Sequence, residues 1–482
     1  MTVGEAVWTG SWVAERLGVR VEGDGVAVLV GLALRHNPRR AHLLVSRVLG
    51  KHVPTDPRLV RAAGLALGAR VAEVLDGRPR PRVSLQAALE DVPGAAAAVR
   101  DELVRSARIP SGPAGSGSSV TGPVGSSPSR VTVLGYAETA TGLGHLVAEA
   151  LDAEVYLHST RRPVAGVNGT GGFAEEHSHA SEHLLLPADP GLLTGGGPLV
   201  LVDDELSTGR TVANTMRALH RLSARPHYVV ATLADLRSPA DHAVLQALAV
   251  ELGARVDVVA LTAGVVHVPP DVLTAGAALV AEHSPGVSSR TDLPSVPRRA
   301  VKGSSSAPAP IGPARVDLGW PAGLPDGGRH GVLRHHRARL EAELPAMAVR
   351  LAQVLPADGE VLVLGFEELM HAPLRLAEAL ADDQPGLVVR SSTTTRSPVL
   401  AVDADGYAIR HRLVFTSHDE PTDGPGERYA YNIPPGRFAA VALVVDGPGD
   451  TPELAGLLGA LAAVTPSVVL AVLPSYLPGG MS

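Results

Sequence analysis

Two acidic residues followed by a turn of small residues are the strongest chemical signal in the sequence. The apolar run 199–202 (Leu-Val-Leu-Val) can form a buried strand, and Asp203 and Asp204 follow at its carboxyl end. In open α/β sheets that end faces the crevice where ligands bind, and two carboxylates there can accept hydrogen bonds from two ribose hydroxyls. The turn that follows consists of Ser207, Thr208, Gly209, Arg210 and Thr211. Its N–H and hydroxyl groups, with the positive end of the next helix, can wrap a phosphate.

This string resembles the signature of the type I phosphoribosyltransferases, which bind 5-phosphoribosyl pyrophosphate (PRPP). The resemblance implies that Asp203 and Asp204 hold the ribose and that residues 207–211 hold its 5′-phosphate. Arg210 departs from the family pattern, which usually has a small residue there, so it either adds a phosphate contact or points outward. An ordinary strand that ends in acids before a capped helix is the plainer alternative, but the full combination favours a phosphoribosyl site.

In that family a pyrophosphate-binding loop follows the first core strand, and residues 135–144 take this place here. Small residues let the backbone approach a diphosphate, and the next helix adds its dipole. The loop residues expected at the pyrophosphate are Glu138, Thr139, Ala140, Thr141 and Gly142. Glu138 is unusual beside an anion, so it could instead hold Mg²⁺ or act on the acceptor.

Arg161 and Arg162 follow the next strand, where the family has a mobile loop over the reacting centre. Their charge and fork geometry suit a departing pyrophosphate, which makes them catalytic candidates. The alternative is a solvated arginine pair at a strand end.

Two further stretches could face the acceptor or an anion. Residues 166–184 have the length and composition of a lid, with Glu176, His177 and His179 as candidates for substrate contact. Zinc is an alternative, but the spacing fixes no zinc geometry and the chain has no cysteine, so no metal ligand from the protein is predicted. In the N-terminal segment, Arg39 and Lys51 lie in basic turns beside an apolar run and could point at an anion or simply at solvent.

Segments rich in Gly, Ser and Pro divide the chain. Residues 110–130 and 284–313 are predicted to be linkers. They leave 1–109 as the N-terminal part, or hood, of the first domain, 131–283 as its core, and 314–482 as a C-terminal α/β domain. The core alternates short apolar strands with helices, which predicts an α/β fold with a parallel sheet, as in the type I phosphoribosyltransferases.

The C-terminal segment repeats patterns of the core in the same order. Residues 131–151 resemble 361–380, 155–164 resemble 388–399, and 199–211 correspond to 442–454. A degenerate copy explains this order, although Ala- and Val-rich sequences also match by chance. The later segment lacks the paired acids and the Ser-Thr-Gly turn, so it is not expected to bind PRPP. Pocket candidates there are Glu367, Glu368, Thr395, Arg396, His418 and Asp419, which could position the acceptor or a partner enzyme.

The string Thr395-Arg396-Ser397-Pro398, with the blocks 37–54, 135–145, 158–163 and 175–183, resembles one phosphoribosyltransferase family in particular. Its members carry a C-terminal TRSP (Thr-Arg-Ser-Pro) domain and are associated with bacterial tellurium-resistance and stress operons. The resemblance implies synthesis of a nucleoside-like metabolite, with other enzymes of the operon as possible partners.

Composition narrows the possible partners and the cellular location of the protein. The formal net charge of −7, without a basic block, argues against nucleic acid as a partner. No apolar stretch of about 20 residues predicts a membrane span, and the start of the chain does not read as a signal peptide. A soluble cytoplasmic protein is therefore expected. A homodimer is expected as well.

The expected reaction is transfer of phosphoribosyl from PRPP to a nitrogen nucleophile, with Mg²⁺ bound mainly through PRPP and pyrophosphate released. The acceptor is a small molecule that the sequence does not identify. A PRPP-sensing regulator on the same fold and an enzyme that runs in the phosphorolytic direction are the alternatives.

Overall fold

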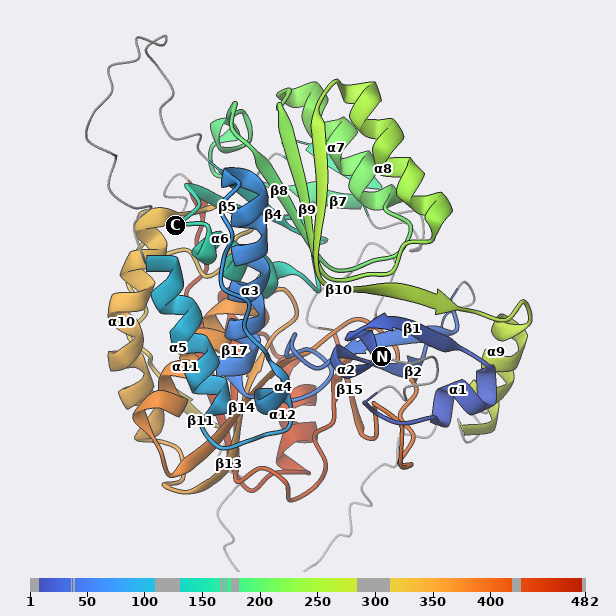
Figure 1. Ribbon diagram of the computed structural model, residues 1–482. Helices are drawn as coiled ribbons and strands as arrows, with labels where there is room; N and C mark the ends of the chain where they lie inside the picture. Colours follow the sequence, from blue (N-terminus) through green and yellow to red (C-terminus); the bar gives the residue numbers. More distant parts are fainter. Residues whose placement is uncertain are drawn as a thin grey trace, which may run out of the picture.

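The computed structural model describes residues 8–35, 37, 40–108, 131–164, 167, 169, 171–174, 182–283, 313–417 and 426–478. Figure 1 shows how these parts are arranged. Both predicted linkers lie outside the described residues, apart from Pro313.

A seven-stranded sheet forms the first half of the molecule, in the order β1-β10-β9-β8-β4-β5-β12. Its five inner strands are parallel. They are β4 (Thr132–Gly135), β5 (Val155–His158), β8 (Leu199–Leu206), β9 (His227–Asp235) and β10 (Arg255–His267). Short antiparallel strands complete the two edges, β1 (Arg20–Asp24) and β12 (Val332–Leu333).

Helices cover both faces of this sheet, because side chains of a strand point alternately to its two sides. On β8, Val200 and Val202 pack toward α3 (Pro57–Asp76) and α6 (Thr141–Ala150). Leu199 and Leu201 pack toward α7 (Arg210–Leu222) and α8 (Pro239–Leu252) on the other face. The strand is therefore apolar on both sides up to the point where its acids begin, as the parallel-sheet prediction requires.

The first part of the N-terminal segment forms a subdomain beside the sheet (Figure 1). A β-hairpin joins β2 (Val30–Leu34) to β3 (His42–Ser46). Beside the hairpin lie α1 (Trp12–Leu17) and α2 (Val26–Leu29), and α9 (Val272–His283) from later in the chain packs against α1. The later helices of the segment, α4 (Gln86–Leu89) and α5 (Ala95–Arg108), pack together next to α3 instead. The hairpin shares one apolar core with C-terminal side chains such as Val399, Ile409 and Tyr431.

A second sheet of five parallel strands forms the C-terminal half, in the order β11-β18-β17-β13-β14. Its strands are β11 (Ala314–Val316), β13 (Gly359–Gly365), β14 (Leu387–Thr393), β17 (Ala440–Asp446) and β18 (Val468–Leu473). Its helices are α10 (Arg334–Ala352), α11 (His371–Asp383) and α12 (Leu454–Ala462), and it contains the short 3₁₀ helix η2 (Gly447–Gly449). The other short 3₁₀ helix, η1 (Pro190–Leu193), belongs to the first half.

The two sheets share a strand order. In the first half, β4, β5, β8 and β9 lie in the order β9-β8-β4-β5, and in the second half β13, β14, β17 and β18 lie in the order β18-β17-β13-β14. A helix follows the first strand of each set, and an antiparallel hairpin interrupts each set after its second strand. These hairpins are β6 (Gly171–Ala174) with β7 (Glu182–Leu185), and β15 (Arg412–Thr416) with β16 (Glu427–Tyr431). Different strand orders would have excluded a duplicated unit, and the orders agree.

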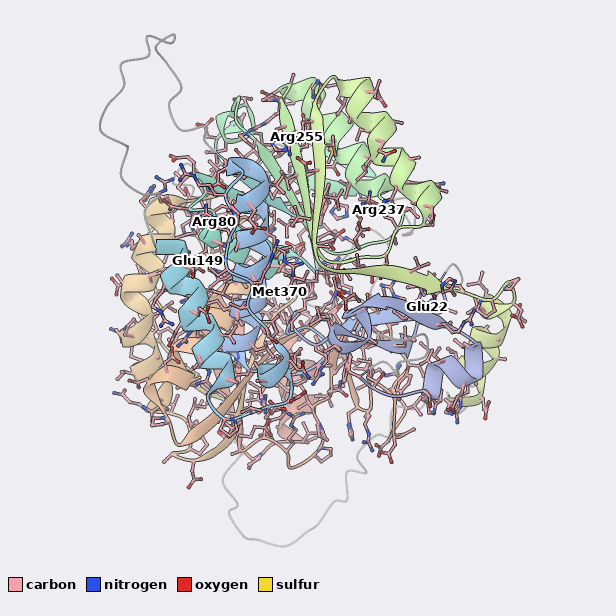
Figure 2. The ribbon with its side chains drawn as sticks, viewed as in Figure 1. Glu22, Arg80, Glu149, Arg237, Arg255 and Met370 are labelled. Carbon is pink, nitrogen blue, oxygen red and sulfur yellow. The ribbon has the colours of Figure 1, made fainter. Side chains whose placement is uncertain are left out.

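The halves are in direct contact through α3, α6 and α11. Met370, at the start of α11, belongs to the core that packs beneath the first sheet, and it lies near the centre of the molecule in Figure 2. None of the helices within the described residues has the length and apolar character that crossing a bilayer requires.

Candidate functional site

The acids predicted to hold a ribose lie at the carboxyl end of β8, in the middle of the first sheet. Asp203 and Asp204 are half-buried, and the N–H of Asp204 donates to Oδ1 of Asp203 at 3.0 Å. Burial and the neighbouring Glu205 raise the pKa of Asp204, whereas Lys51 opposes this rise. The paired acids therefore sit at the rim of the core, where a ligand can reach them.

The predicted phosphate turn joins β8 directly to α7. Gly209 precedes the helix with a φ of 75°, a left-handed conformation that any side chain would strain. Ser207 and Thr208 are half-buried, while the side chain of Arg210 is exposed. The N–H of Arg210 lies 3.4 Å from Oγ1 of Thr208. The turn thus presents small groups and a helix N-terminus beside the two acids, which suits an anion.

Lys51 reaches the site from the N-terminal segment. Its side chain is buried, and Nζ donates to Oγ1 of Thr139 in the predicted pyrophosphate loop at 3.3 Å. Burial lowers the pKa of Lys51, against the carboxylates of Glu138 and Asp204, which raise it. The ammonium group therefore lies near both the predicted pyrophosphate loop and the predicted ribose acids.

Glu138 contacts the other half of the chain. It is buried, and it follows a cis peptide bond between Ala137 and Glu138. Its Oε2 accepts from Oγ1 of Thr395 at 3.2 Å and from the N–H of Arg396 at 3.3 Å. Its Oε1 lies 3.0 Å from Nε of Arg396. The glutamate that looked misplaced beside an anion is therefore paired with the Thr-Arg-Ser-Pro string.

The remaining residues of the predicted pyrophosphate loop lead into α6, which begins at Thr141. Ala140 precedes it, and Gly142 sits in its first turn, where an added Cβ would come within 3.1 Å of Met370. The turn is buried, so what it offers a diphosphate is backbone N–H groups at the start of a helix.

The two predicted arginines lie in different places. Arg162 is buried, and its Nη2 pairs with Oε2 of Glu367 at 2.8 Å, with Asp446 at 3.8 Å from Nη1. Arg161 is half-buried, and its positive charge acts on Lys51, whose pKa it lowers. The side chain of Arg161 therefore lies on the side of Lys51 and the predicted pyrophosphate loop, whereas the side chain of Arg162 joins the two halves.

The carboxylates of Glu367 and Glu368 bind groups from the segments that follow β5 and β14. Oγ1 of Thr160 donates to both oxygens of Glu368, at 3.0 and 2.8 Å, and the N–H of Arg161 donates to Oε1 at 3.1 Å. Burial alone would raise the pKa of Glu368, but Arg329 and other cations outweigh it and lower the pKa to about 2. Both glutamates are therefore ionised parts of an interface between the halves.

Sequence reasoning missed one pair at the rim. Arg40 makes an ion pair with Glu205, next to the ribose acids. Burial, with the charge of Arg40, lowers the pKa of His42 beside them to about 4. The acid that follows Asp203 and Asp204 was the available signal, since a third carboxylate on a half-buried strand end needs a cation.

Some predicted residues lie outside the described part of the chain. They are Arg39, Glu176, His177, His179, His418 and Asp419.

A cavity of about 320 Å³ lies between α3, β10 and residues 80–89, and none of the predicted site residues lines it.

Comparison with family models agrees with this geometry. Residues 29–265 match the family described as phosphoribosyl transferase. Residues 326–461 match the family described as TRSP domain C terminus to PRTase_2. The chain carries a phosphoribosyltransferase domain followed by a TRSP domain. The prediction of a pentosyltransferase with an α/β fold is thereby confirmed at the level of the family.

Solved structures of other phosphoribosyltransferases show limited similarity to the chain. Adenine phosphoribosyltransferase of Rhodothermus marinus is 15% identical, over 49% of this chain and 96% of that one, with a TM-score of 0.27. The Trypanosoma brucei adenine enzyme is 16% identical over 27% of this chain, with a TM-score of 0.22, and the match spans only 56% of that enzyme. Orotate phosphoribosyltransferase of Aeropyrum pernix is 20% identical over 27% of this chain and 59% of that one, with a TM-score of 0.18. Similarity of this extent says nothing about the acceptor. None of the curated proteins compared with the chain matches it.

Proposed function

We propose that the phosphoribosyltransferase domain transfers the phosphoribosyl group of PRPP to a nitrogen nucleophile. The nitrogen forms a bond to ribose C1, and the bond from C1 to the pyrophosphate oxygen breaks, so that pyrophosphate leaves with that electron pair. The observation that carries the proposal is the junction of β8 and α7, where Asp203 and Asp204 stand beside the turn 207–211. One junction thus offers acceptors for two hydroxyls and donors for a phosphate.

The two ends of the donor molecule would lie on different elements. Asp203 and Asp204 would hold the ribose hydroxyls, and the turn at Gly209 would hold the 5′-phosphate. Pyrophosphate would lie against the start of α6, with Lys51 and Arg161 as its cations. Burial makes these charges effective, because a desolvated ammonium group interacts more strongly with an anion than a hydrated one does.

The residues at the site fit Mg²⁺ carried by the substrate. Within the described ranges, no three His, Asp or Glu side chains are grouped to hold a metal ion. Mg²⁺ binds through one or two carboxylates together with substrate phosphates and keeps several waters, and Asp203 and Asp204 could supply such carboxylates. When bound, the ion would shield the charge of the leaving pyrophosphate.

The cellular location, the oligomeric state, the product and the operon context stay predictions. A cytoplasmic location, a homodimer, a nucleoside-like product and a place in a tellurium-resistance or stress operon come from the sequence and its family resemblance.

The test combines binding with a product search. Calorimetry with PRPP and Mg²⁺ measures donor binding, and incubation with purines, pyrimidines and small amines, followed by mass spectrometry, detects a ribosylated product. Asp204→Asn should abolish the product, because an amide cannot replace an ionised acceptor of ribose hydroxyls. The control is Asp257→Asn on β10, whose carboxylate pairs with His227 and Arg255 at the other end of the sheet.

Each result assigns one function. Product formation that needs an acceptor and fails in Asp204→Asn supports the transferase. PRPP binding without turnover supports a sensor, and turnover only from a ribonucleotide with added pyrophosphate supports the reverse direction. Full activity of Asp204→Asn would remove the site assignment.

A further inference from the structure

Two contacts between the halves of the chain mirror one another. From the first half, Oγ1 of Thr160 and the N–H of Arg161 donate to the carboxylate of Glu368. From the second half, Oγ1 of Thr395 and the N–H of Arg396 donate to the carboxylate of Glu138. In each case a threonine hydroxyl and the next backbone N–H hold one glutamate of the other half.

The mirrored residues occupy the same places in the two sheets. Thr160 follows β5 and Thr395 follows β14, the second strands of the two sets. Glu138 follows β4 and Glu368 follows β13, the first strands. The helices that come next meet between the halves, where the rings of His145 (α6) and His371 (α11) stack at 4.0 Å with an angle of 6°.

Reciprocal contact of equivalent residues is the mark of an isologous interface between two like subunits. Here the two units lie in one chain, and their strand orders agree. We propose that the TRSP domain is a degenerate second copy that docks on the first as a partner subunit would. We further propose that its Thr395-Arg396 pair is a positioning device for the pyrophosphate loop. This inference rests on the proposed function and names the part that the second copy plays in that site.

Charge explains why the loop needs such a device. A free carboxylate on Glu138 would repel a diphosphate bound next to it. Arg396 pairs with that carboxylate and is itself held by Glu367, whose Oε2 lies 3.0 Å from its Nε. The charge of Glu138 is therefore neutralised by Arg396 across the interface.

The TRSP domain also fixes the segment that carries Lys51. Oγ of Ser392 donates to the carbonyl oxygen of Lys51 at 2.8 Å. Thr55 and Ser391 exchange backbone hydrogen bonds of 3.1 and 2.8 Å. Nδ2 of Asn432 donates to the carbonyl oxygen of His52 at 2.9 Å. Both protein elements that face the proposed pyrophosphate are thus tied to the second copy.

The second copy itself does not offer a matching donor site. Asp446 stands where the ribose acids stand in the first copy, but its Oδ1 accepts from the N–H of Gly449 at 3.0 Å and caps η2. Its other oxygen lies 3.8 Å from both Arg162 and Arg329. The described part of the chain therefore offers one candidate donor site, in the first copy, and the second copy supports it.

The test separates the pyrophosphate end of the donor from its phosphate end. Ribose 5-phosphate contacts only the 203–211 side, whereas PRPP also needs the 138–142 loop. Thr395→Val removes the hydroxyl that holds Glu138 and keeps the shape of the buried side chain. We expect the dissociation constant of PRPP to rise about tenfold, as for loss of one hydrogen bond to a charged group, and that of ribose 5-phosphate to change less than twofold.

Two further variants make the result decisive. Thr395→Ser keeps the hydroxyl and should retain the PRPP affinity of the natural protein. Asp91→Asn weakens another contact between the halves, the ion pair of 3.0 Å with Arg390, and should leave both affinities unchanged. Equal weakening of both ligands by Thr395→Val, or none, overturns the positioning role. If the natural protein binds ribose 5-phosphate and PRPP equally, the loop does not hold pyrophosphate and the inference fails; if it binds neither, the proposed function fails first.

Discussion

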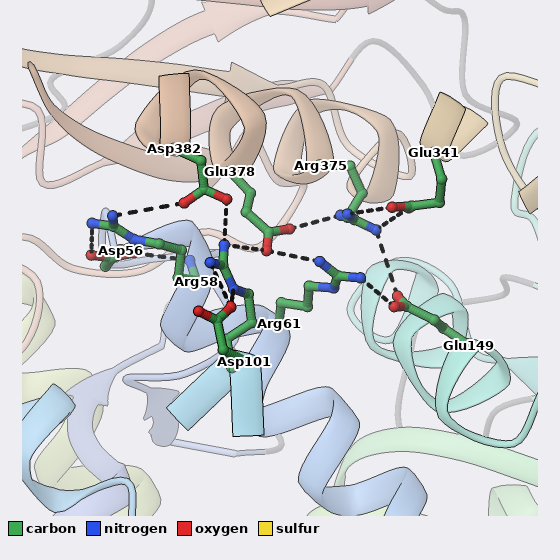
Figure 3. Close-up of polar contacts among 10 residues, drawn as sticks. Asp56, Arg58, Arg61, Asp101, Glu149, Glu341, Arg375, Glu378 and Asp382 are labelled. Carbon is green, nitrogen blue, oxygen red and sulfur yellow. Dashed lines mark hydrogen bonds and ion pairs between the residues drawn. The ribbon is translucent and has the colours of Figure 1, made fainter. Parts of the chain in front are cut away.

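The buried carboxylate of Glu378 gives a quantitative test of how the two halves are joined. Figure 3 shows it on α11, surrounded by arginines from both halves of the chain. Its Oε1 lies 2.9 Å from Nη1 of both Arg61 and Arg100, and its Oε2 lies 2.8 Å from Nε of Arg375. The carboxylate is almost fully buried, with 2% of its side chain exposed, so solvent screens these pairs very little.

The pKa sets the size of the effect. Burial alone would raise the pKa of Glu378, but the three guanidinium groups outweigh it and lower the pKa from 4.5 to about 2. A shift of that size corresponds to about 3 kcal/mol of stability, which is present above the unfolded pKa and is lost as pH falls through the folded one. Glu378→Gln removes the charge and keeps the shape, so it should lower the free energy of unfolding by about 3 kcal/mol near neutral pH.

Urea unfolding followed by circular dichroism measures this difference. Glu251→Gln is the control, because Glu251 pairs with Arg217 at the surface, and this change should leave the midpoint where it is. A loss below about 1 kcal/mol in Glu378→Gln would show that the arginines are satisfied by their other carboxylates. Those carboxylates are Glu149, Glu341, Asp101 and Asp382.

Two further predictions concern packing and pH. An added Cβ at Gly64 of α3 would lie 2.4 Å from Cβ of Leu146 on α6, so Gly64→Ala should cost about 1–3 kcal/mol in urea unfolding, and an unchanged midpoint would contradict the close helix contact. Burial lowers the pKa of His158 in the folded protein to about 4. As pH falls below about 6.5, this histidine is therefore protonated in the unfolded chain while it is still neutral in the folded protein. This group alone should therefore lose about 1.4 kcal/mol of stability between about pH 7.5 and 5.5, and His158→Asn should show a correspondingly flatter dependence; equal slopes would refute a neutral buried His158.

The junction of β8 and α7 that forms the candidate donor site could be predicted from sequence because its signals are local. An apolar run that ends in two acids, followed by Ser-Thr-Gly and an amphipathic helix, fixes a strand, a turn and a helix within residues 199–222. The parallel sheet followed from the alternation of such units. The prediction for Lys51 was the least local, since only its basic neighbours and the apolar run before it suggested that it faces an anion.

The partners of Glu138 and Arg162 could not be predicted in the same way. Both residues are paired across more than 200 positions of sequence, with Arg396 and Glu367 respectively. Spacing along the chain carries no information about such pairs, because they depend on how two units dock. The Thr-Arg-Ser-Pro string was visible, but nothing local distinguishes a motif that binds a ligand from one that holds another loop.

A charged interface of this kind also bears on how the site can move. Buried ion pairs contribute little net stability relative to apolar contacts, but breaking one is expensive because a charge is left without its partner. Such pairs join the halves at Glu367 and Glu378, and the carboxylate of Glu368 accepts a hydrogen bond from Thr160 across the same interface, so the interface has few partly open states of low energy. On the proposed function, motion that admits PRPP and releases pyrophosphate therefore belongs to elements outside this interface, and the predicted pyrophosphate loop, tied through Glu138, should stay in place throughout the reaction.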